Sequence, residues 1–460
     1  MGFDDPDDNT RFPGLTPAGA AMLERLREHP CAPIYRNQSG HRLLPEEVPQ
    51  VLQFAAEVRG AVVDPVSAPM PGWLTAFVAD ALARVPHYRR HGSPPAALAD
   101  LPTIDRGTLA RDIAPFVPDD QPLDRLINFR TTGTTGQPLL IASHPLVAAR
   151  YLAFHERALA RRGIELASGP GDVGVMLVGW QQRCFTYVSI TPQRGECGLA
   201  KINLHPDDWR DPAHRGAYID ALQPEVMTGD PLSLAALLEI GFAHRPRAIL
   251  STSMTLLPGL RQALEQRFAC PVLDIYSLNE AGPIAVYNPA LDGHVLLQPR
   301  MAVEIVDAQG VPQPEGARGE ITLTGGFNFC LPLVRYRTGD FAALEQRGGE
   351  WVLAGLSGRA PVRFRCADGS WVNNIDVTHA LKPYALPQYA LLQRADGRFE
   401  FTAWRAGAVD AVALKAALHG LLGAAAQLSV EFSDAEVDKV VQYRTELPGG
   451  AIGESVAGRA

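Results

Sequence analysis

The sequence predicts an α/β protein in two parts. The first is a large multi-layer N-terminal region with wound parallel sheets and a β-rich subdomain, and the second is a small α+β C-terminal domain. The chain of 460 residues is long enough for two or three domains. Apolar strands alternate with amphipathic helices from residue 172 to 277, which is typical of a parallel sheet. From residue 300 to 360 the pattern changes to short strands separated by glycine turns.

The N-terminal quarter of the chain, to about residue 125, is expected to be mostly helical with proline-rich loops. In the segment LTAFVADALARVPHYRRH, residues 74–91, apolar residues recur at helical spacing. Pro86 lacks the amide donor that a helix interior needs, so this helix is expected to stop near that residue.

The next region is expected to form a wound α/β unit. Three segments are apolar and strand-like, and two segments between them have helical periodicity. The strand-like segments are DVGVMLVGW (172–180), RAILSTS (247–253) and PVLDIYS (271–277), and the helical ones are DPLSLAALLEIGF (230–242) and PGLRQALEQRF (258–268).

The last third of the chain changes character twice. MAVEIVD, GEITLTG and EWVLAG are short strands of the expected β-rich subdomain. Beyond them, the helical AVDAVALKAALHGLLG and the strand-like QLSVEFS predict a small α+β domain. We therefore predict an N-terminal domain of residues 1–359, which holds the functional site, and a C-terminal domain of residues 360–460.

The composition indicates a globular protein, with 46% hydrophobic and 20% charged residues. The net charge of −8 and the lack of a basic tract argue against a nucleic-acid partner. The apolar runs are too short to cross a membrane, and the acidic start MGFDDPDDNTRFPG lacks the pattern of a signal peptide. The six scattered cysteines are expected to be reduced, buried thiols, with a zinc site as the alternative. We therefore expect a cytoplasmic protein without a membrane partner.

Residues 129–138, FRTTGTTGQP, contain two kinds of residue that suit a phosphate, glycine and threonine. Glycine lets the backbone approach a ligand closely. Backbone N–H groups and threonine hydroxyls together form a donor-rich concavity for phosphate oxygens. The segment is not a Walker A loop, because the spacing and the terminal Lys-Ser/Thr are missing. On these residues alone, phosphate binding and a plain surface turn are equally open.

Four further segments follow this loop in a fixed order: LDIYSLNEAGPIAVY (273–287), GEITLTG (319–325), PLVRYRTGD (332–340) and GLSGR (355–359). In this order they resemble the motifs of the adenylate-forming (ANL) superfamily of acyl-CoA synthetases and adenylation domains. The most similar branch is that of the phenylacetate-CoA ligases, whose members carry D-I-Y-G-L-S-E and P-L-I-R-Y-R-T-G-D stretches. Shorter segments such as LARVPHYRRHG and STSMTLLPGLRQALEQRF extend the resemblance over much of the chain. The ordered set is far more specific than any single motif.

The resemblance implies that a carboxylate joins the α-phosphorus of ATP, giving acyl-AMP and pyrophosphate. Glu280 would hold Mg²⁺, a hard cation that prefers carboxylate oxygen, and its neighbour Asn279 would contact the nucleotide. The β and γ phosphates would lie against the threonine and glycine residues of the loop, namely Thr131, Thr132, Gly133, Thr134, Thr135 and Gly136.

Three more residues complete the implied nucleotide site. Tyr276 would stack on adenine, and the Asp340 carboxylate would accept two hydrogen bonds from the ribose diol. Arg359 would reach the ribose or a phosphate with its fork of donors, and it joins Glu280 as a candidate catalytic residue. Outside these motifs, each residue has a more ordinary interpretation. Tyr276 would be a core aromatic, Arg359 part of a surface ion pair and Glu280 a solvated acid of a loop.

An acyl pocket is expected between the first strand of the α/β region and the 276–283 loop. Trp180, Phe185 and Gly282 match lining positions of the family, although each is equally compatible with ordinary core. His294, in DGHVLLQP, matches another family position, where a structural role is at least as open as a catalytic one.

Two places depart from the family pattern, and both concern the C-terminal domain, which acts as a lid in that family. Ala360 and Pro361 stand where an acidic hinge residue is usual, and proline handicaps a large rotation. Glu454 aligns with a lysine that bridges the carboxylate and the α-phosphate, and a carboxylate there would repel the charge that lysine neutralises. A slip in the alignment of the tail is the alternative explanation. The other cations near the end of the chain are Lys439, Arg444 and Arg459.

We therefore expect ATP-dependent activation of a small carboxylic acid, an aromatic one by the resemblance, followed by transfer to coenzyme A. The altered tail leaves two alternatives open. One is an adenylate-forming enzyme that passes the acyl group to an amine or a carrier-protein thiol. The other is a non-adenylating relative that binds nucleotide or acyl-AMP. The expected ligands are ATP and Mg²⁺, with coenzyme A for the first function, and a homodimer is compatible with each reading.

Overall fold

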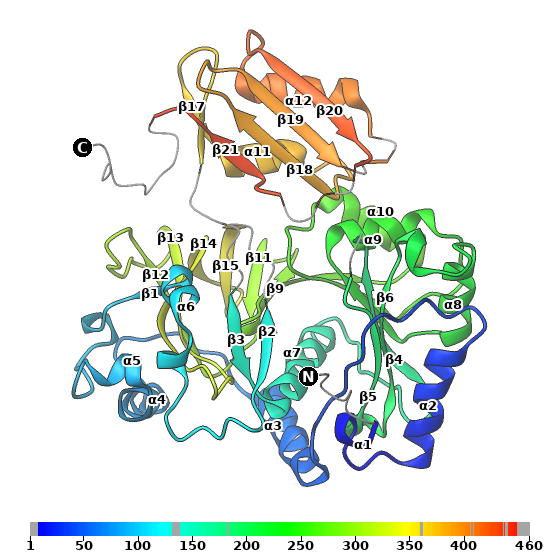
Figure 1. Ribbon diagram of the computed structural model, residues 1–460. Helices are drawn as coiled ribbons and strands as arrows, with labels where there is room; N and C mark the ends of the chain where they lie inside the picture. The colour runs from blue at the N-terminus through cyan, green and yellow to red at the C-terminus, as the bar shows by residue number, and fades with distance from the viewer. Residues whose placement is uncertain are drawn as a thin grey trace.

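The computed structural model describes residues 8–130, 139–181, 184–358, 362–404, 406–407, 409–435, 437 and 440–448. Within these residues the chain forms a 13-stranded sheet and a separate four-stranded sheet near the C-terminus, with helices packed on both (Figure 1). Two two-stranded ladders complete the β structure. The predicted mixed α/β fold class is confirmed.

The helices that the sequence predicts from apolar periodicity are present. The segment predicted to be helical at 258–268 is helical over these same residues, and the helix predicted to stop near Pro86 ends at Arg84. The α-helices are α1 (Asp8–Arg11), α2 (Pro17–Glu28), α3 (Val48–Gly60), α4 (Gly72–Arg84), α5 (Pro86–Arg89), α6 (Arg106–Arg111), α7 (Pro145–Ala160), α8 (His214–Leu222), α9 (Pro231–Glu239), α10 (Pro258–Phe268), α11 (Asn374–Leu381) and α12 (Ala411–Leu422).

The large sheet runs through most of the N-terminal region. Its strands are β1 (Ile104–Asp105), β4 (Val173–Gly179), β5 (Tyr187–Thr191), β6 (Cys197–Asn203), β7 (Val226–Gly229), β8 (Ala248–Ser251), β9 (Val272–Leu278), β10 (Gly282–Asn288), β11 (Gly293–Leu296), β12 (Met301–Val306), β13 (Arg318–Gly325), β14 (Leu333–Arg347) and β15 (Glu350–Gly358).

One half of this sheet is parallel. Strands β9, β8, β7, β4 and β6 pair in parallel in this spatial order, and β5 adds an antiparallel edge. All four residues of β8 are buried, as expected for a strand covered on both faces. The crossover helix α9 begins where Asp230 accepts a hydrogen bond from the Ser233 amide and Pro231 occupies the first helical position.

The other half is antiparallel and corresponds to the expected β-rich subdomain. Strands β12, β13, β14, β15, β11, β10 and β9 are neighbours in this order, and β1 pairs with β14 in parallel. Strand β9 belongs to both halves, because it pairs with β8 along one edge and with β10 along the other. The wound sheet and the β-rich region are therefore one continuous sheet, whose two halves are seen side by side in Figure 1.

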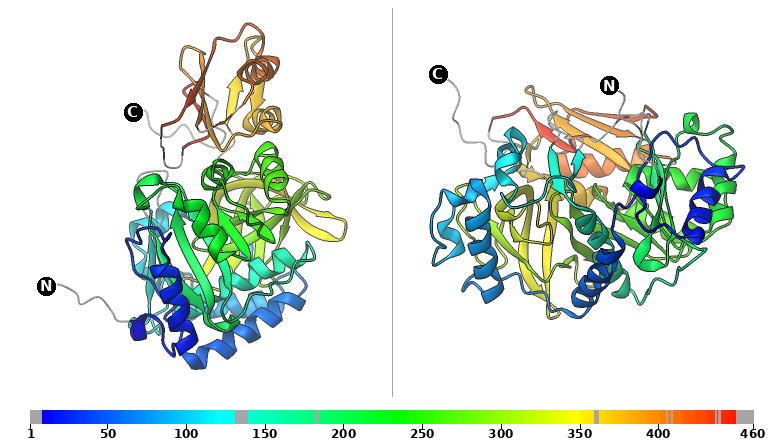
Figure 2. Two further views of the ribbon diagram at one scale, coloured as in Figure 1. Left: turned by 90° about the vertical axis from the view of Figure 1, so that its right-hand side faces the viewer. Right: turned by 60° about the horizontal axis from the view of Figure 1, so that its bottom comes forward.

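The C-terminal residues form a second folded unit with a core of its own. The four-stranded sheet has the order β20 (Leu428–Ser433), β19 (Phe399–Trp404), β18 (Gln388–Gln393) and β21 (Tyr443–Thr445). Helices α11 and α12 and the short ladder of β16 (Arg363–Arg365) and β17 (Trp371–Asn373) belong to the same unit. Figure 2 shows this unit standing on one end of the larger region. The boundary at residue 360 stays a prediction.

The C-terminal unit docks on the start of α10. Leu257, the residue before this helix, is 1% exposed and packs in the core of the C-terminal unit. The Gly259 amide donates to the Lys382 carbonyl at 3.1 Å. A Cβ atom at position 259 would lie 2.5 Å from the carbonyl carbon of Tyr384, so only glycine allows this approach.

Replacing Gly259 with alanine is expected to disturb this docking. The control is Gly420→Ala, because Gly420 is also helical but a Cβ there meets nothing within 4 Å. Helix propensity alone should raise the free energy of unfolding of the control by up to about 1 kcal/mol. Gly259→Ala should lose that gain and increase the radius of gyration measured by small-angle scattering. Equal stability and equal radii for the two variants would show that the contact does not hold the C-terminal unit.

Candidate functional site

The candidate site lies at one edge of the parallel half of the sheet. The carboxyl ends of parallel strands meet at the same edge, and ligands of α/β proteins bind there. Trp180 follows β4 at this edge, Thr252 follows β8, and the turn of residues 279–281 follows β9. This turn joins β9 to β10, and β9 carries Tyr276 just before it.

Glu280 is the centre of this turn, and its side chain is almost fully buried, with 3% of the residue exposed. The Tyr336 hydroxyl donates a hydrogen bond to Glu280 Oε1 at 2.5 Å. The guanidinium of Arg106, which begins α6, approaches the same oxygen to 3.9 Å. A buried carboxylate is costly without donors, so these two groups account for its presence inside the protein.

Tyr276 and Asp340 meet across two strands that are far apart in the sequence. The Tyr276 hydroxyl donates to Asp340 Oδ2 at 2.8 Å. Burial, followed by the nearby Asp340 carboxylate, raises the pKa of Tyr276 well above its ordinary value. The phenol therefore stays protonated and donating throughout the neutral range. Tyr276, Glu280 and Asp340 thus lie in one neighbourhood, built from β9, its turn and β14.

The residues around Asp340 divide between the site and the core. Arg335 is 2% exposed and donates to the Glu304 carboxylate at 3.1 Å and to the Leu101 carbonyl at 2.7 Å. Arg337 donates to Glu320 at 2.7 Å. Both arginines therefore hold the subdomain together, and Tyr336 and Asp340 are the members of this segment that reach the candidate site.

Strand pairing brings the end of β15 beside Asp340. In the register of β14 and β15, Asp340 pairs with Gly358, the last described residue before the predicted Arg359. Arg359 itself lies outside the described residues, as do the loop residues Thr131, Thr132, Gly133, Thr134, Thr135 and Gly136 and the tail residue Glu454.

The turn that carries Glu280 is held by two side chains that the sequence patterns did not single out. Gln298 is 3% exposed, and its Nε2 donates to the Ala281 carbonyl at 2.7 Å and to the Pro283 carbonyl at 2.8 Å. The Tyr151 hydroxyl, from α7, donates to the Asn279 carbonyl at 2.7 Å. Asn279 therefore contributes its backbone carbonyl to the turn. Its side chain is exposed, and its contact with a nucleotide stays a prediction.

Gly282 begins β10 in a conformation that favours glycine, with φ at +74°. A Cβ atom there would lie 2.5 Å from the ring of Phe327. Phe327 in turn meets the Tyr151 ring, with centroids 5.2 Å apart. A packing requirement thus explains this glycine, and its predicted role in lining an acyl pocket stays a prediction.

The other two predicted lining residues follow β4. The Trp180 ring is partly buried and lies 5.7 Å from the His205 ring. Asn203, fully buried, donates to the Gln181 carbonyl at 2.6 Å and so holds the segment that follows Trp180. Phe185 is 51% exposed. Trp180 therefore lies at the expected edge of the sheet, and Phe185 presents an apolar ring to solvent.

His294 lies on β11 and pairs with a carboxylate on β9. Its Nε2 is 3.5 Å from Asp274 Oδ2, and both side chains are largely buried. Its ring also meets the Tyr287 ring, with centroids 5.2 Å apart. These contacts support the structural interpretation of this histidine.

The types of side chain near Glu280 indicate what kind of metal site is available. Within the described ranges no group of three or more His, Cys, Asp and Glu side chains could enclose an ion. All six cysteines are free thiols, and all but Cys31 are buried. Glu280 offers a carboxylate oxygen, the type of ligand that Mg²⁺ prefers. None of the described helices has the length and apolarity needed to cross a lipid bilayer.

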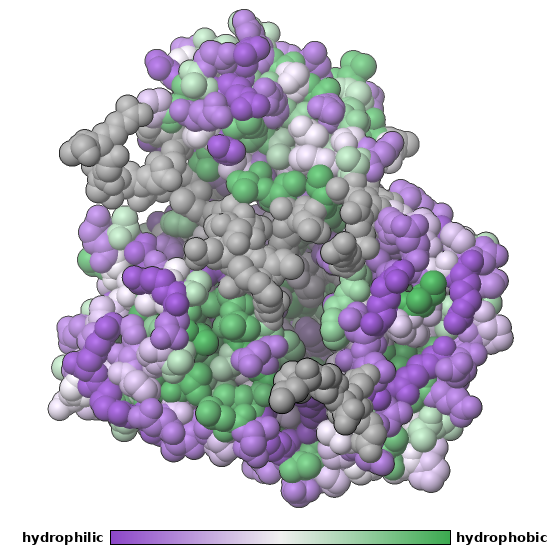
Figure 3. Space-filling model, viewed as in Figure 1, coloured by the Kyte–Doolittle hydropathy of each residue, from purple (hydrophilic) through white to green (hydrophobic). Residues whose placement is uncertain are grey.

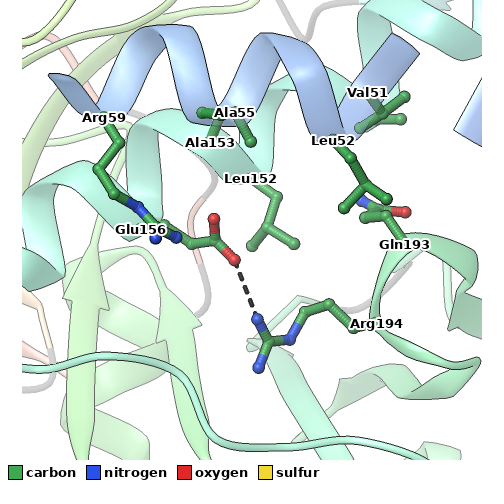
Figure 4. A pocket seen from close by; sticks show the side chains of 11 residues that line it. Val51, Leu52, Ala55, Arg59, Leu152, Ala153, Glu156, Gln193 and Arg194 are labelled. Atoms are coloured by element: carbon green, nitrogen blue, oxygen red, sulfur yellow. Dashed lines mark hydrogen bonds and ion pairs between the residues drawn. The ribbon is translucent and has the colours of Figure 1, made fainter. Parts of the chain in front are cut away.

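A hollow of about 230 Å³ lies between α3 and α7, and none of the predicted site residues lines it. Figure 4 shows Glu156 and Arg194 pointing toward one another at its side, with Nη1 and Oε1 3.1 Å apart. Alanines on both helices, including Ala55 and Ala153, leave this space.

Strands β2 (Ile127–Arg130) and β3 (Leu140–Ser143) form an antiparallel ladder at the two ends of the Thr/Gly loop. Phe129 and Leu140 in this ladder are 40% and 49% exposed. Figure 3 shows that apolar side chains gather on this face of the molecule, amid a mostly hydrophilic surface.

The chain matches the model of the AMP-binding enzyme family over residues 197–329. It is 26% identical to the phenylacetate-coenzyme A ligase of Aromatoleum evansii over 298 residues, which are 58% of this chain and 64% of that protein. It is 23% identical to protein CapK of Staphylococcus aureus over 263 residues, 54% of this chain and 55% of that protein. The chain thus spans less than two thirds of the length of these relatives.

A solved structure supports the fold. The crystal structure of 2-hydroxyisobutyryl-CoA ligase, in the postadenylation state with R3-HIB-AMP, aligns with a TM-score of 0.61. The alignment covers 81% of this chain and 88% of that one at 16% identity, so it bears on the fold alone. Together the comparisons confirm the resemblance to the adenylate-forming superfamily. The particular likeness is to its phenylacetate-CoA ligase-like branch.

Replacing Gly282 with alanine is expected to destabilise the protein through both its backbone and the Phe327 ring. Gly163→Ala is the matched control, because Gly163 has φ at +70° and a Cβ there meets nothing within 4 Å. The backbone alone should cost about 1–2 kcal/mol in each variant. Urea denaturation should give a larger loss for Gly282→Ala, and Phe327→Leu in that background should recover part of it. Equal losses for the two glycines would contradict the packing requirement.

Proposed function

We propose that this protein is an acid-activating ligase. It would join a small carboxylic acid to the α-phosphorus of ATP, release pyrophosphate and pass the acyl group of acyl-AMP to coenzyme A. The observation that carries this function is the hydrogen bond between Tyr276 and Asp340, at 2.8 Å, beside the buried Glu280. Three residues expected at one nucleotide site thus lie within one neighbourhood, although the chain separates them by up to 64 positions.

The reaction brings together two anions, a carboxylate and a triphosphate. Catalysis therefore depends on holding them in line for attack and on offsetting their charge where it builds up. The protein as a whole has a net charge of −8, so this compensation must be local. Arg106, at the edge of the candidate site, is one cation that the structure places there.

Glu280 is the residue that would hold Mg²⁺. Its Oε1 receives the hydrogen bond from Tyr336, which leaves Oε2 as the oxygen for an ion. Bound magnesium would neutralise phosphate charge. Glu280 would fix the position of the triphosphate relative to β9, and the threonine and glycine residues at 131–136 would donate to its β and γ phosphates.

Asp340 and Tyr276 would bind the nucleoside. A carboxylate has about four acceptor sites, so Asp340 can accept from the ribose diol while it also accepts from Tyr276. That hydrogen bond fixes the tyrosine ring, whose face would stack on adenine. By its place in the family motif, Arg359 would reach the ribose or a phosphate.

The proposed function also includes the class of acid that is activated and the domain that closes over it. The names of the phenylacetate-coenzyme A ligases among its relatives support an aromatic acid. Trp180 and Phe185 would provide an apolar surface for it at the edge of β4. The C-terminal unit, from residue 360 onward, would act as the lid.

Two features of the sequence favour a different outcome. Glu454 aligns with the bridging lysine of the family unless the alignment of the tail slips, and Ala360-Pro361 align with the hinge. An enzyme with this tail would use an amine or a carrier-protein thiol as acceptor, or would bind nucleotide or acyl-AMP without forming it.

Pyrophosphate release is the direct test of adenylation. With ATP, Mg²⁺ and a panel of aryl and alkyl acids, but without an acceptor, the full-length protein should release pyrophosphate with at least one acid. Glu280→Gln should lower the rate more than about 100-fold, because it removes the charged metal ligand. Asp340→Ala should raise the KM for ATP. Glu24→Gln, an exposed acid on α2, is the control and should leave the rate unchanged.

The acceptor is identified by adding coenzyme A or amines to the same reaction. Release of pyrophosphate without thioester formation would favour the amine or carrier-protein reading. If no acid elicits pyrophosphate release but prepared acyl-AMP is turned over, the protein is not an adenylating enzyme.

Glu454→Lys tests the assignment of the tail. A cation in place of a carboxylate near the reacting phosphate should raise the rate of acyl-AMP formation by about tenfold or more. Glu431→Lys, an exposed charge reversal on β20, is the control and should have no effect. An unchanged rate in Glu454→Lys would remove the tail as an argument for the alternative functions.

A further inference from the structure

The hydroxyl of Tyr336 is a polar group placed deep inside the protein. Tyr336 is 0% exposed, and its ring belongs to the core shared by α4 and the antiparallel half of the sheet. A phenylalanine would fill the same space without a polar atom. Burying a hydroxyl costs free energy unless it is paired, and here its partner is Glu280 Oε1 at 2.5 Å.

The strands around Tyr336 make it a rigid support. It lies on β14, opposite Ile104 of β1 on one side and opposite Leu323 of β13 on the other. The pairing with β1 also places Arg106 nearby, because Arg106 directly follows Asp105, the partner of Arg337. Tyr336 on β14 and Arg106, the first residue of α6 directly after β1, therefore approach Glu280 Oε1 from two neighbouring segments.

The hydrogen bond from Tyr336 restrains the Glu280 carboxylate. Its donor is held by the strands on either side, and Glu280 Oε1 accepts at 2.5 Å. A donor held at Oε1 limits the rotation of the carboxylate and leaves Oε2 as the oxygen available to another ligand.

We propose that Tyr336 is a positioning residue that turns Oε2 of Glu280 toward the metal ion bound with the nucleotide, a role that rests on the function proposed above. Tyr336 would not touch the metal or the substrate. It would act as groups behind metal ligands commonly act, by holding the ligand in the orientation that binds. Nothing in the motif pattern distinguishes this role from that of a core aromatic.

The test compares nucleotide affinity with and without metal. Calorimetry of the full-length protein gives the affinity for ATP in saturating Mn²⁺ and in EDTA, and the ratio of the two is the enhancement due to the metal. Tyr336→Phe should lower this ratio about 10- to 100-fold and leave the affinity in EDTA unchanged. Glu280→Gln is the reference for complete loss of the metal ligand.

Tyr88→Phe is the matched control, because it also removes a buried hydroxyl near the same strand. Tyr88 is 3% exposed and donates to the Pro332 carbonyl at 3.1 Å, with no bond to Glu280. This variant should keep the wild-type ratio. A circular-dichroism melt of both variants shows whether each is folded at the temperature of the titration.

The outcomes separate the positioning role from the proposed function. If the wild type shows metal enhancement and Tyr336→Phe retains it, the positioning role is wrong and the proposed function stands. If Tyr336→Phe and Tyr88→Phe lower the ratio equally, the effect belongs to packing and the positioning role is again wrong. If the wild type binds no nucleotide in Mn²⁺, both are wrong.

Discussion

The burial of one carboxylate is the constraint on which the site depends. Glu280 lies in a turn with 3% of its surface exposed, and such a charge is tolerated only where donors replace the lost water. The Tyr336 hydroxyl, on β14, and the Arg106 guanidinium, at the start of α6, meet that need. The turn that carries Glu280 must also be held in place. Gln298 and Tyr151 hold it by donating hydrogen bonds to backbone carbonyls at and beside the turn. The geometry of the site thus follows from where a charge can be buried.

Strand β9 connects this constraint to the rest of the protein. It is the strand at which the parallel half of the sheet meets the antiparallel half. The parallel half directs its strand ends to one edge, where ligands of α/β folds bind, and the antiparallel half brings Asp340 and Tyr336 to the same place on β14. A single continuous sheet therefore forms the neighbourhood from segments that are distant in sequence. The C-terminal unit is docked separately, through Leu257 and Gly259 at the start of α10.

Much of the fold was readable in the sequence, because periodicity and helix-start signals are local. The strands at 173–179, 248–251 and 272–278 and the helix at 258–268 lie where apolar patterns predicted them. That the two halves form one continuous sheet could not be predicted, because the sequence of a strand does not indicate which other strand it pairs with. The packing at Gly282 could not be predicted either. The family motif indicated a pocket position, whereas the structure shows that a Cβ atom there would collide with the Phe327 ring.

The sequence by itself determined the order of the motifs and the residue types they contain, and hence the candidates Tyr276, Glu280 and Asp340. Only the tertiary structure decided that Tyr276 donates to Asp340 and that a core tyrosine supports Glu280. The physical reason is that residue type and periodicity are properties of neighbours along the chain. The partner of a buried polar group depends on which distant segment the folded backbone brings within hydrogen-bonding distance.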